Sequence, residues 1–169
     1  FVAAQYYPKT NKISLGICDT GIGLKASLNR FHYPKDDADA IRLALTPGVS
    51  GATFHAGGND QNAGAGLYII KSLAKITRNY FTIYSGDTEY KLLKYDKRVK
   101  NGPRFYANPF DDKHSLFEDL PNFNGTLVGV DFSLNDDKNF NELMEIVKKN
   151  YSKVIREKRK TVYRKINFS

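Results

Sequence analysis

The sequence has few of the residues on which several classes of protein depend. Its 169 residues include one cysteine, Cys18, which excludes a disulfide within the chain and a zinc site built on several thiolates. The three histidines, His32, His55 and His114, show no metal-ligand spacing with one another or with acidic residues, so the chain offers no metal site. No apolar run approaches the roughly 20 residues that cross a bilayer. We therefore expect a cytoplasmic protein without a membrane span.

What the sequence does contain is typical of a globular domain with unevenly distributed charge. Hydrophobic residues make up 41% and charged residues 26%, and the length suffices for one compact domain. The net charge of +8 resides between residues 148 and 165, where nine Lys or Arg accompany one acid, Glu157. We expect one domain over residues 1–147, followed by a basic helix end and tail over residues 148–169. Because the chain begins at Phe1 and not at Met, we expect a fragment or a processed product.

Hydrophobic periodicity predicts a mixture of strands and helices. The predicted strands, of which the second is expected to be buried, cover residues 1–7, 13–18, 80–85, 88–95 and 126–134. The predicted helices cover residues 25–31, 36–45, 67–78 and 140–154. In the third of these helices, Lys71, Lys75 and Arg78 recur at the spacing of a polar face. Residues 47–64 form a glycine-rich loop, and residues 97–124 resist assignment.

The segment 19–24, DTGIGL, directly follows a predicted strand. A carboxylate at the end of a strand, here Asp19, can accept a hydrogen bond from the exocyclic amine of adenine. Gly21 and Gly23 let the backbone turn and approach a base without a Cβ in the way. The simpler interpretation is a strand followed by a glycine turn.

Two further segments offer a phosphate site and a hydroxyl. In segment 62–67, NAGAGL, a glycine loop leads into a helix, whose free N–H groups and dipole favour triphosphate oxygens over Gly64 to Leu67. Thr126, at the start of a predicted strand, offers a hydroxyl that supports the adenine contact directly or through water. Each segment alone is a common turn, but the three in this order are a specific combination.

The order strand, Asp-x-Gly-x-Gly, glycine-rich loop, Gly-x-Gly-Leu helix, hairpin and Gly-Thr strand resembles the GHKL ATPases. This superfamily includes gyrase, heat-shock chaperone, histidine kinase and mismatch-repair proteins, and the resemblance covers residues 13–134. The motif sequences DTGIG and GLYIIK are similar in particular to those of the histidine kinase branch. The resemblance implies a two-layer α/β sandwich, the Bergerat fold, in which helices cover one face of a mixed sheet and ATP lies between them.

The same resemblance implies roles for single residues. Asp19 would read adenine with support from Thr126, and residues 47–63 would form the ATP lid. The residues assigned to the nucleotide are Asp19, Gly21, Gly23, Leu24, Gly64, Ala65, Gly66, Leu67 and Thr126. ATP or ADP is the expected ligand, and the expected function is that of a regulatory or signalling module acting with a protein partner or an upstream domain.

The chain departs from the family pattern before Asp19. In the family, a helix with an Asn that binds Mg²⁺, and often a Glu that activates water, precedes this motif, whereas residues 1–17 read as a hairpin. That helix is expected to lie upstream or to be absent, so Mg²⁺ would bind through residues outside this chain. ATPase or kinase activity depends on that upstream motif, and no catalytic residue is assigned.

Two other interpretations have support in the sequence. Residues 21–26, GIGLKA, match the G-x-G-x-x-A of dinucleotide-binding domains, but Pro34 ends the following helix early and segment 62–67 is left unexplained. The basic residues after Lys148 suit nucleic acid phosphates or an acidic partner, although a solvated helix face explains them as well and is favoured. Residues 162–168 alternate apolar and polar, so a strand that joins another chain or domain is an alternative there.

Overall fold

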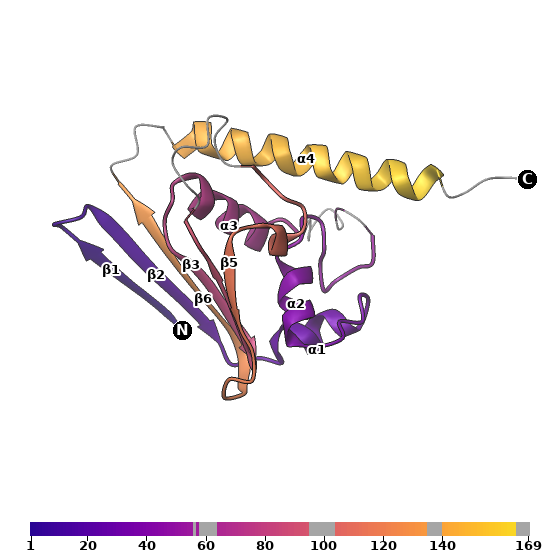
Figure 1. Ribbon diagram of the computed structural model, residues 1–169, viewed down its shortest axis with the longest axis horizontal. Coiled ribbons are helices and arrows are strands. Elements are labelled where there is room, and N and C mark those ends of the chain that lie inside the picture. Colours follow the sequence, from indigo (N-terminus) through magenta and orange to yellow (C-terminus); the bar gives the residue numbers. More distant parts are fainter. Residues whose placement is uncertain (56, 58–63, 95–103, 135–139, 165–169) are drawn as a thin grey trace, which may run out of the picture.

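A computed structural model of the chain describes residues 1–55, 57, 64–94, 104–134 and 140–164, with side chains up to residue 160. Within this part, a six-stranded sheet and four α-helices form an α/β structure. The strands are β1 (Val2–Tyr7), β2 (Lys12–Asp19), β3 (Phe81–Gly86), β4 (Thr88–Leu92), β5 (His114–Phe117) and β6 (Phe123–Ser133). The helices are α1 (Gly23–Asn29), α2 (Asp37–Ala44), α3 (Gly66–Ile76) and α4 (Phe140–Arg164), and η1 (Pro109–Asp111) is a 3₁₀ turn. All four helices lie on one side of the sheet (Figure 1).

The sheet has the strand order β1-β2-β6-β3-β4-β5, and each of its strand pairs is antiparallel. The expectation of a mixed sheet is therefore wrong. β1 with β2 and β3 with β4 are hairpins, whose short connections require antiparallel pairing. β6 inserts between β2 and β3 and runs antiparallel to both of them. The predicted strands are confirmed with shifted ends, and β5 and η1 come from residues 97–124, which sequence periodicity leaves unassigned.

Alternation along the strands gives the sheet an apolar face towards the helices. Phe81 and Ile83 of β3 are fully buried, and Val130 of β6 is 3% exposed. Ile41 of α2 and Ala74 of α3 pack into the same core from the helix side. Because burial of a large apolar side chain contributes about 1.5–3 kcal/mol, this layer is the main attachment of the helices to the sheet.

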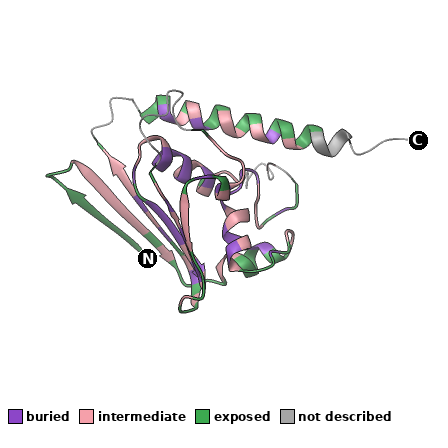
Figure 2. Ribbon diagram, in the orientation of Figure 1, coloured by how far each residue is buried: buried purple, intermediate pink, exposed green. Residues whose placement is uncertain are grey.

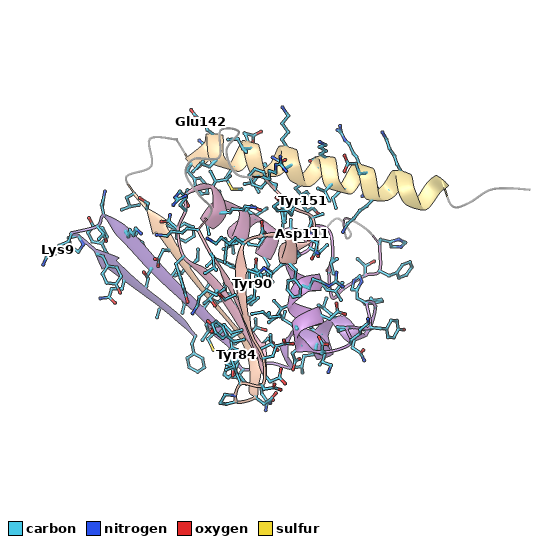
Figure 3. The ribbon with its side chains drawn as sticks, in the orientation of Figure 1. Lys9, Tyr84, Tyr90, Asp111, Glu142 and Tyr151 are labelled. Carbon is cyan, nitrogen blue, oxygen red and sulfur yellow. The ribbon has the colours of Figure 1, made fainter. Side chains whose placement is uncertain are left out.

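α3 lies between the sheet and α4. Tyr68 of α3 packs against Val147 of α4, while Ala74 of α3 faces the sheet core. Tyr151 belongs to α4, and its ring centroid lies 6.0 Å from that of Tyr68 in α3 (Figure 3). These contacts on two sides explain why the sequence GLYIIKSLAKI is apolar around most of the helix circumference.

α4 is a long helix with a packed inner face and an exposed outer face (Figure 2). Its 25 residues extend over about 37 Å and run past the predicted end near residue 154. Val147 and Ile155 are buried on the inner face. The alternative of a strand over residues 162–168 is contradicted as far as residue 164, which is helical, and the remainder lies outside the described residues. Of the described helices, none has both the length and the apolar character that a membrane span requires.

The β1–β2 hairpin is the least covered part of the sheet. β1 is exposed along its whole length, and Ile17 of β2 is 42% exposed (Figure 2). The strand that was expected to be buried, residues 13–18, is therefore only partly buried. The reason is that the described helices pack mainly over β3, β4 and β6.

Candidate functional site

The ends of three neighbouring strands place three polar residues in one row. In the strand register Asp19 of β2 lies opposite Thr126 of β6, and Thr126 lies opposite Ser85 of β3. Side chains two residues apart point to the same face of a strand, so this row shares the helix-covered face with Ile83 and Val128. Asp19 and Thr126 were predicted to act together, and the sheet makes them direct neighbours.

Ser85 was not predicted, although it connects two of the predicted segments. Its hydroxyl donates a hydrogen bond to the carbonyl oxygen of Gly125 at 2.7 Å. The same hydroxyl oxygen accepts a hydrogen bond from the backbone N–H of Leu24 at 3.0 Å. The side chain is 2% exposed, so both bonds are shielded from water. A serine near the end of a strand has no distinctive spacing, and for this reason the sequence did not single it out.

Two glycines are required where these segments meet. Gly23, the first residue of α1, has φ of +74°, and a Cβ there would lie 3.1 Å from the Ser85 hydroxyl oxygen. Gly125 has φ of +136°, and a Cβ there would overlap the carbonyl oxygen of Asp19. Both positions combine a left-handed backbone with close approach of another chain segment, which explains the glycines in terms of the fold alone.

The Asp19 carboxylate is exposed and holds its own loop. One of its oxygens, Oδ1, accepts a hydrogen bond from the backbone N–H of Gly21 at 2.8 Å. No other described residue hydrogen-bonds this carboxylate, and Oδ2 keeps its capacity to accept. The hydroxyl of the adjacent, half-buried Thr126 is likewise without a partner among the described residues. An acceptor and a hydroxyl thus lie next to each other at the rim of the sheet.

The predicted phosphate segment lies at the start of α3. The N-cap residue, Ala65, provides no side-chain hydrogen bond, and its carbonyl accepts from Ile69 N–H at 2.9 Å. Within the described part of the chain, no side chain therefore caps the N–H groups of the first helical turn before Ile69. Gly66 is exposed, and a Cβ there would meet no atom of the described residues within 4 Å. Open space and uncapped donors are the two properties that an anion site at a helix N-terminus requires. Asn62 and Ala63 of the motif lie outside the described residues.

The two predicted halves of the site are anchored to one core. Leu24 in α1 and Leu67 in α3 both pack against the buried cluster on the sheet. The first part of the glycine-rich loop also rests on the region of α1, because His32 Nε2 lies 2.9 Å from the Ser50 carbonyl oxygen and 3.1 Å from that of Thr53. The predicted lid over residues 47–63 is described at residues 47–55 and 57 only.

Of the predicted residues, Gly23 and Leu24 line a hollow beside α1. A polar hollow of about 350 Å³ beside α1 is lined by Gly23, Leu24 and Ser85, and by Asp37 and Asn124 from neighbouring segments. Asp19, Thr126 and the start of α3 are not part of its lining. Asp19 is exposed and Thr126 half-buried at the rim of the sheet, as expected beside the uncovered face of β2, whereas Ser85 is buried.

The lysines predicted on the polar face of α3 are buried. Lys71 and Lys75 both donate to the carboxylate of Asp112, and Lys75 also donates to the carbonyl oxygen of Arg104. Lys71 is 1% exposed, and burial lowers its pKa even though the Asp112 carboxylate opposes that shift. The spacing predicts a polar face but not its burial, because the segment that covers it, residues 104–112, has no recognisable pattern.

Comparison with known proteins adds no relative to these observations. No model of a known protein family matches the chain. A search of curated proteins finds no match either. The function is therefore inferred from the residues and geometry of the site.

Proposed function

We propose that this chain is an ATP-binding domain of the GHKL type with a Bergerat fold, serving as a regulatory or signalling module that also accepts ADP. The observation that carries the proposal is the row formed by Asp19, Thr126 and Ser85. Three segments separated widely in the sequence meet there. The family resemblance implies Asp19 and Thr126 for an adenine pocket, and Ser85 is a neighbour that the resemblance does not include. The helices on one face of the sheet agree with that fold, whereas the antiparallel pairing of all strands departs from the mixed sheet that the resemblance implies.

The adenine end of the proposed site is the rim of the sheet. Asp19 Oδ2 supplies an acceptor for the exocyclic amine, while Oδ1 keeps the Gly21 turn in place. The Thr126 hydroxyl, beside Asp19 in the register, supports the same edge of the base. A carboxylate disfavours guanine, which presents a carbonyl oxygen instead of an amine at this position, so this pair also sets the base preference.

The phosphate end is the start of α3. Gly64, Ala65, Gly66 and Leu67 offer backbone N–H groups and the positive end of the helix dipole. In the family, the Mg²⁺ ligand lies on a helix before the Asp19 motif, whereas β1 and β2 occupy that part of this chain. We therefore propose that this chain supplies the adenine and phosphate contacts and that Mg²⁺ binds through residues upstream.

Calorimetric titration with ATP, ADP and GTP tests the proposal. We expect saturable binding of ATP and ADP, weaker binding of GTP, and a loss of ATP affinity of about 10-fold to 100-fold in Asp19→Asn, since a hydrogen bond to a charged group contributes about 1.5–3 kcal/mol. Asp119→Asn, in the exposed turn before β6, is the matched control and should bind ATP as the wild type does. Unchanged ATP affinity in Asp19→Asn would exclude the adenine assignment.

A second candidate function, nucleic acid binding, is favoured by one observation. Lys149, Lys153, Arg156 and Lys160 are exposed and recur at intervals of four, three and four residues, which places them on one face of α4. Concentrated positive charge of this kind suits the phosphate groups of a nucleic acid. It is the alternative to the ATP-binding proposal, and a solvated helix face is the simpler explanation.

A further inference from the structure

α4 crosses the glycine-rich loop that precedes α3. Ile155 packs against this loop so closely that a Cβ at Gly48 would overlap its side chain, and a Cβ at Gly57 would lie 3.0 Å from it. One turn further on, Lys158 Nζ donates a hydrogen bond to the carbonyl oxygen of Pro47 at 3.0 Å. The inner face of α4 is thus attached to the base of the loop by an apolar contact and a charged one.

The ammonium group of Lys158 has no acidic partner among the described residues. The side chain is half-buried, and its one hydrogen bond to a described residue goes to the neutral carbonyl group of Pro47. Burial lowers the pKa of Lys158, and the nearby Arg42 guanidinium lowers it further. Arg42 itself is bound to Asp39 at 2.6 Å, so the Asp39 carboxylate is already engaged. A half-buried ammonium in these surroundings is stabilised by an added anion.

The segment that Lys158 holds also contacts the predicted phosphate residues. Gly48 N–H donates to the carbonyl oxygen of Gly64 at 3.1 Å, and Gly57 N–H donates to the carbonyl oxygen of Gly48 at 3.1 Å. Gly64 is so close to Val49 that a Cβ would overlap the Val49 carbonyl oxygen. A displacement of Pro47 and Gly48 would therefore be transmitted to Gly64, two residues before α3 begins.

We infer that Lys158 is a positioning and charge-supplying residue for the phosphate end of the proposed nucleotide site. It holds the backbone that fixes Gly64, and its positive charge contacts Pro47, whose neighbour Gly48 is hydrogen-bonded to Gly64, two residues before α3 begins. The inference rests on the proposed ATP binding. It also goes beyond it, since Lys158 lies outside residues 13–134, to which the family resemblance is confined. α4 thereby becomes part of the recognition of a nucleoside phosphate over a nucleoside.

The test compares ATP with adenosine, which lacks the phosphates. Calorimetric titrations are carried out on the full chain carrying Lys158→Gln or Lys158→Met, which remove the charge, or Lys158→Arg, which keeps it. Lys153→Gln is the control with the same loss of charge on the exposed face of α4. We expect both uncharged variants to lose ATP affinity about 10-fold, as for removal of one hydrogen bond or contact to a charged group. Adenosine affinity should stay unchanged, Lys158→Arg should retain most of the ATP affinity, and Lys153→Gln should bind both ligands as the wild type does.

Three results would overturn the inference, and a fourth concerns the proposed function. Equal ATP affinity in the uncharged Lys158 variants and in Lys153→Gln would show that position 158 has no special role. An equal loss for ATP and adenosine would mean that Lys158 supports the fold as a whole, and so would loss of a cooperative thermal transition in both uncharged variants. A wild-type chain that binds neither ATP nor adenosine would reject the proposed function itself, and the inference with it.

Discussion

Ser85 shows how one buried hydroxyl can hold together segments that are distant in the sequence. It accepts a hydrogen bond from the N–H of Leu24 and donates one to the carbonyl group of Gly125, in a position shielded from water. Both backbone groups belong to the proposed adenine end of the site. The Ser85 hydroxyl therefore holds the first turn of α1 beside the start of β6, although Ser85 belongs to none of the recognisable motifs.

Replacing this hydroxyl tests its role at the scale of a residue. We expect Ser85→Ala to lower the free energy of unfolding by about 1–3 kcal/mol, because two backbone polar groups lose a shielded partner. Ser152→Ala, at an exposed position in α4, is the control and should change this free energy by less than about 0.5 kcal/mol. Urea denaturation of the two variants measures the difference. Equal stability of the two would contradict the proposed linking role.

At the scale of an element, α3 combines an apolar surface with two buried lysines. Asp112 follows η1 directly and accepts from both Lys71 and Lys75. Two ammonium groups and one carboxylate leave an excess of one positive charge in a buried place. The Asp112 carboxylate therefore offsets the free-energy cost of burying the two lysines on this face of α3. It also attaches residues 104–112 to the helix.

Removing the carboxylate should be more harmful than removing one ammonium group. We expect Asp112→Asn to lower the free energy of unfolding by about 3–5 kcal/mol, since both lysines lose their counter-charge. Lys71→Met should cost less, because it leaves a neutral Lys75–Asp112 pair and a side chain of similar length. Asp111→Asn, at the exposed neighbouring position, is the control for the change of charge and should be close to neutral. Chemical denaturation ranks the three, and an Asp112→Asn variant as stable as Asp111→Asn would disprove the buried role.

At the scale of the whole molecule, positive charge is separated from the proposed nucleotide row. The row lies at the ends of β2, β6 and β3, whereas the exposed lysines and arginine of α4 lie on the outermost helix (Figures 1 and 2). The inner face of the same helix meets the glycine-rich loop through Ile155 and Lys158. α4 therefore has an inner surface that contacts the glycine-rich loop and an outer, basic surface that faces solvent.

The second candidate function makes a prediction for the outer surface. If α4 binds duplex DNA, the logarithm of the association constant should fall with the logarithm of salt concentration at about −0.9 per phosphate contacted. Four cations then give a slope of at most about −3.6, and the double variant Lys153→Gln with Arg156→Gln should reduce its magnitude by about 2. The control is Lys9→Gln with Lys113→Gln, two exposed lysines outside α4. Fluorescence anisotropy over a series of salt concentrations measures the slopes, and equal effects of the two double variants would reject this surface.

Most elements of the fold were predictable, because the information for them is local. Glycine turns end strands, and the spacing of apolar residues marks α2, α3 and α4 as helices. The antiparallel character of the sheet was missed, since pairing is decided between strands far apart in the sequence. The exposure of β2 was missed for the same reason, because it depends on which strands the helices cover.

For the candidate site, the sequence alone indicated Asp19, the two glycine segments and Thr126. These residues could be recognised because side-chain chemistry and turn geometry depend on short stretches of sequence. The sequence also specified the basic end of the chain. Only the tertiary structure made Asp19 and Thr126 neighbours, added Ser85, buried Lys71 and brought Lys158 to the loop. Each of these contacts joins residues that are far apart along the chain, and such contacts arise only when strand register and helix packing are established together.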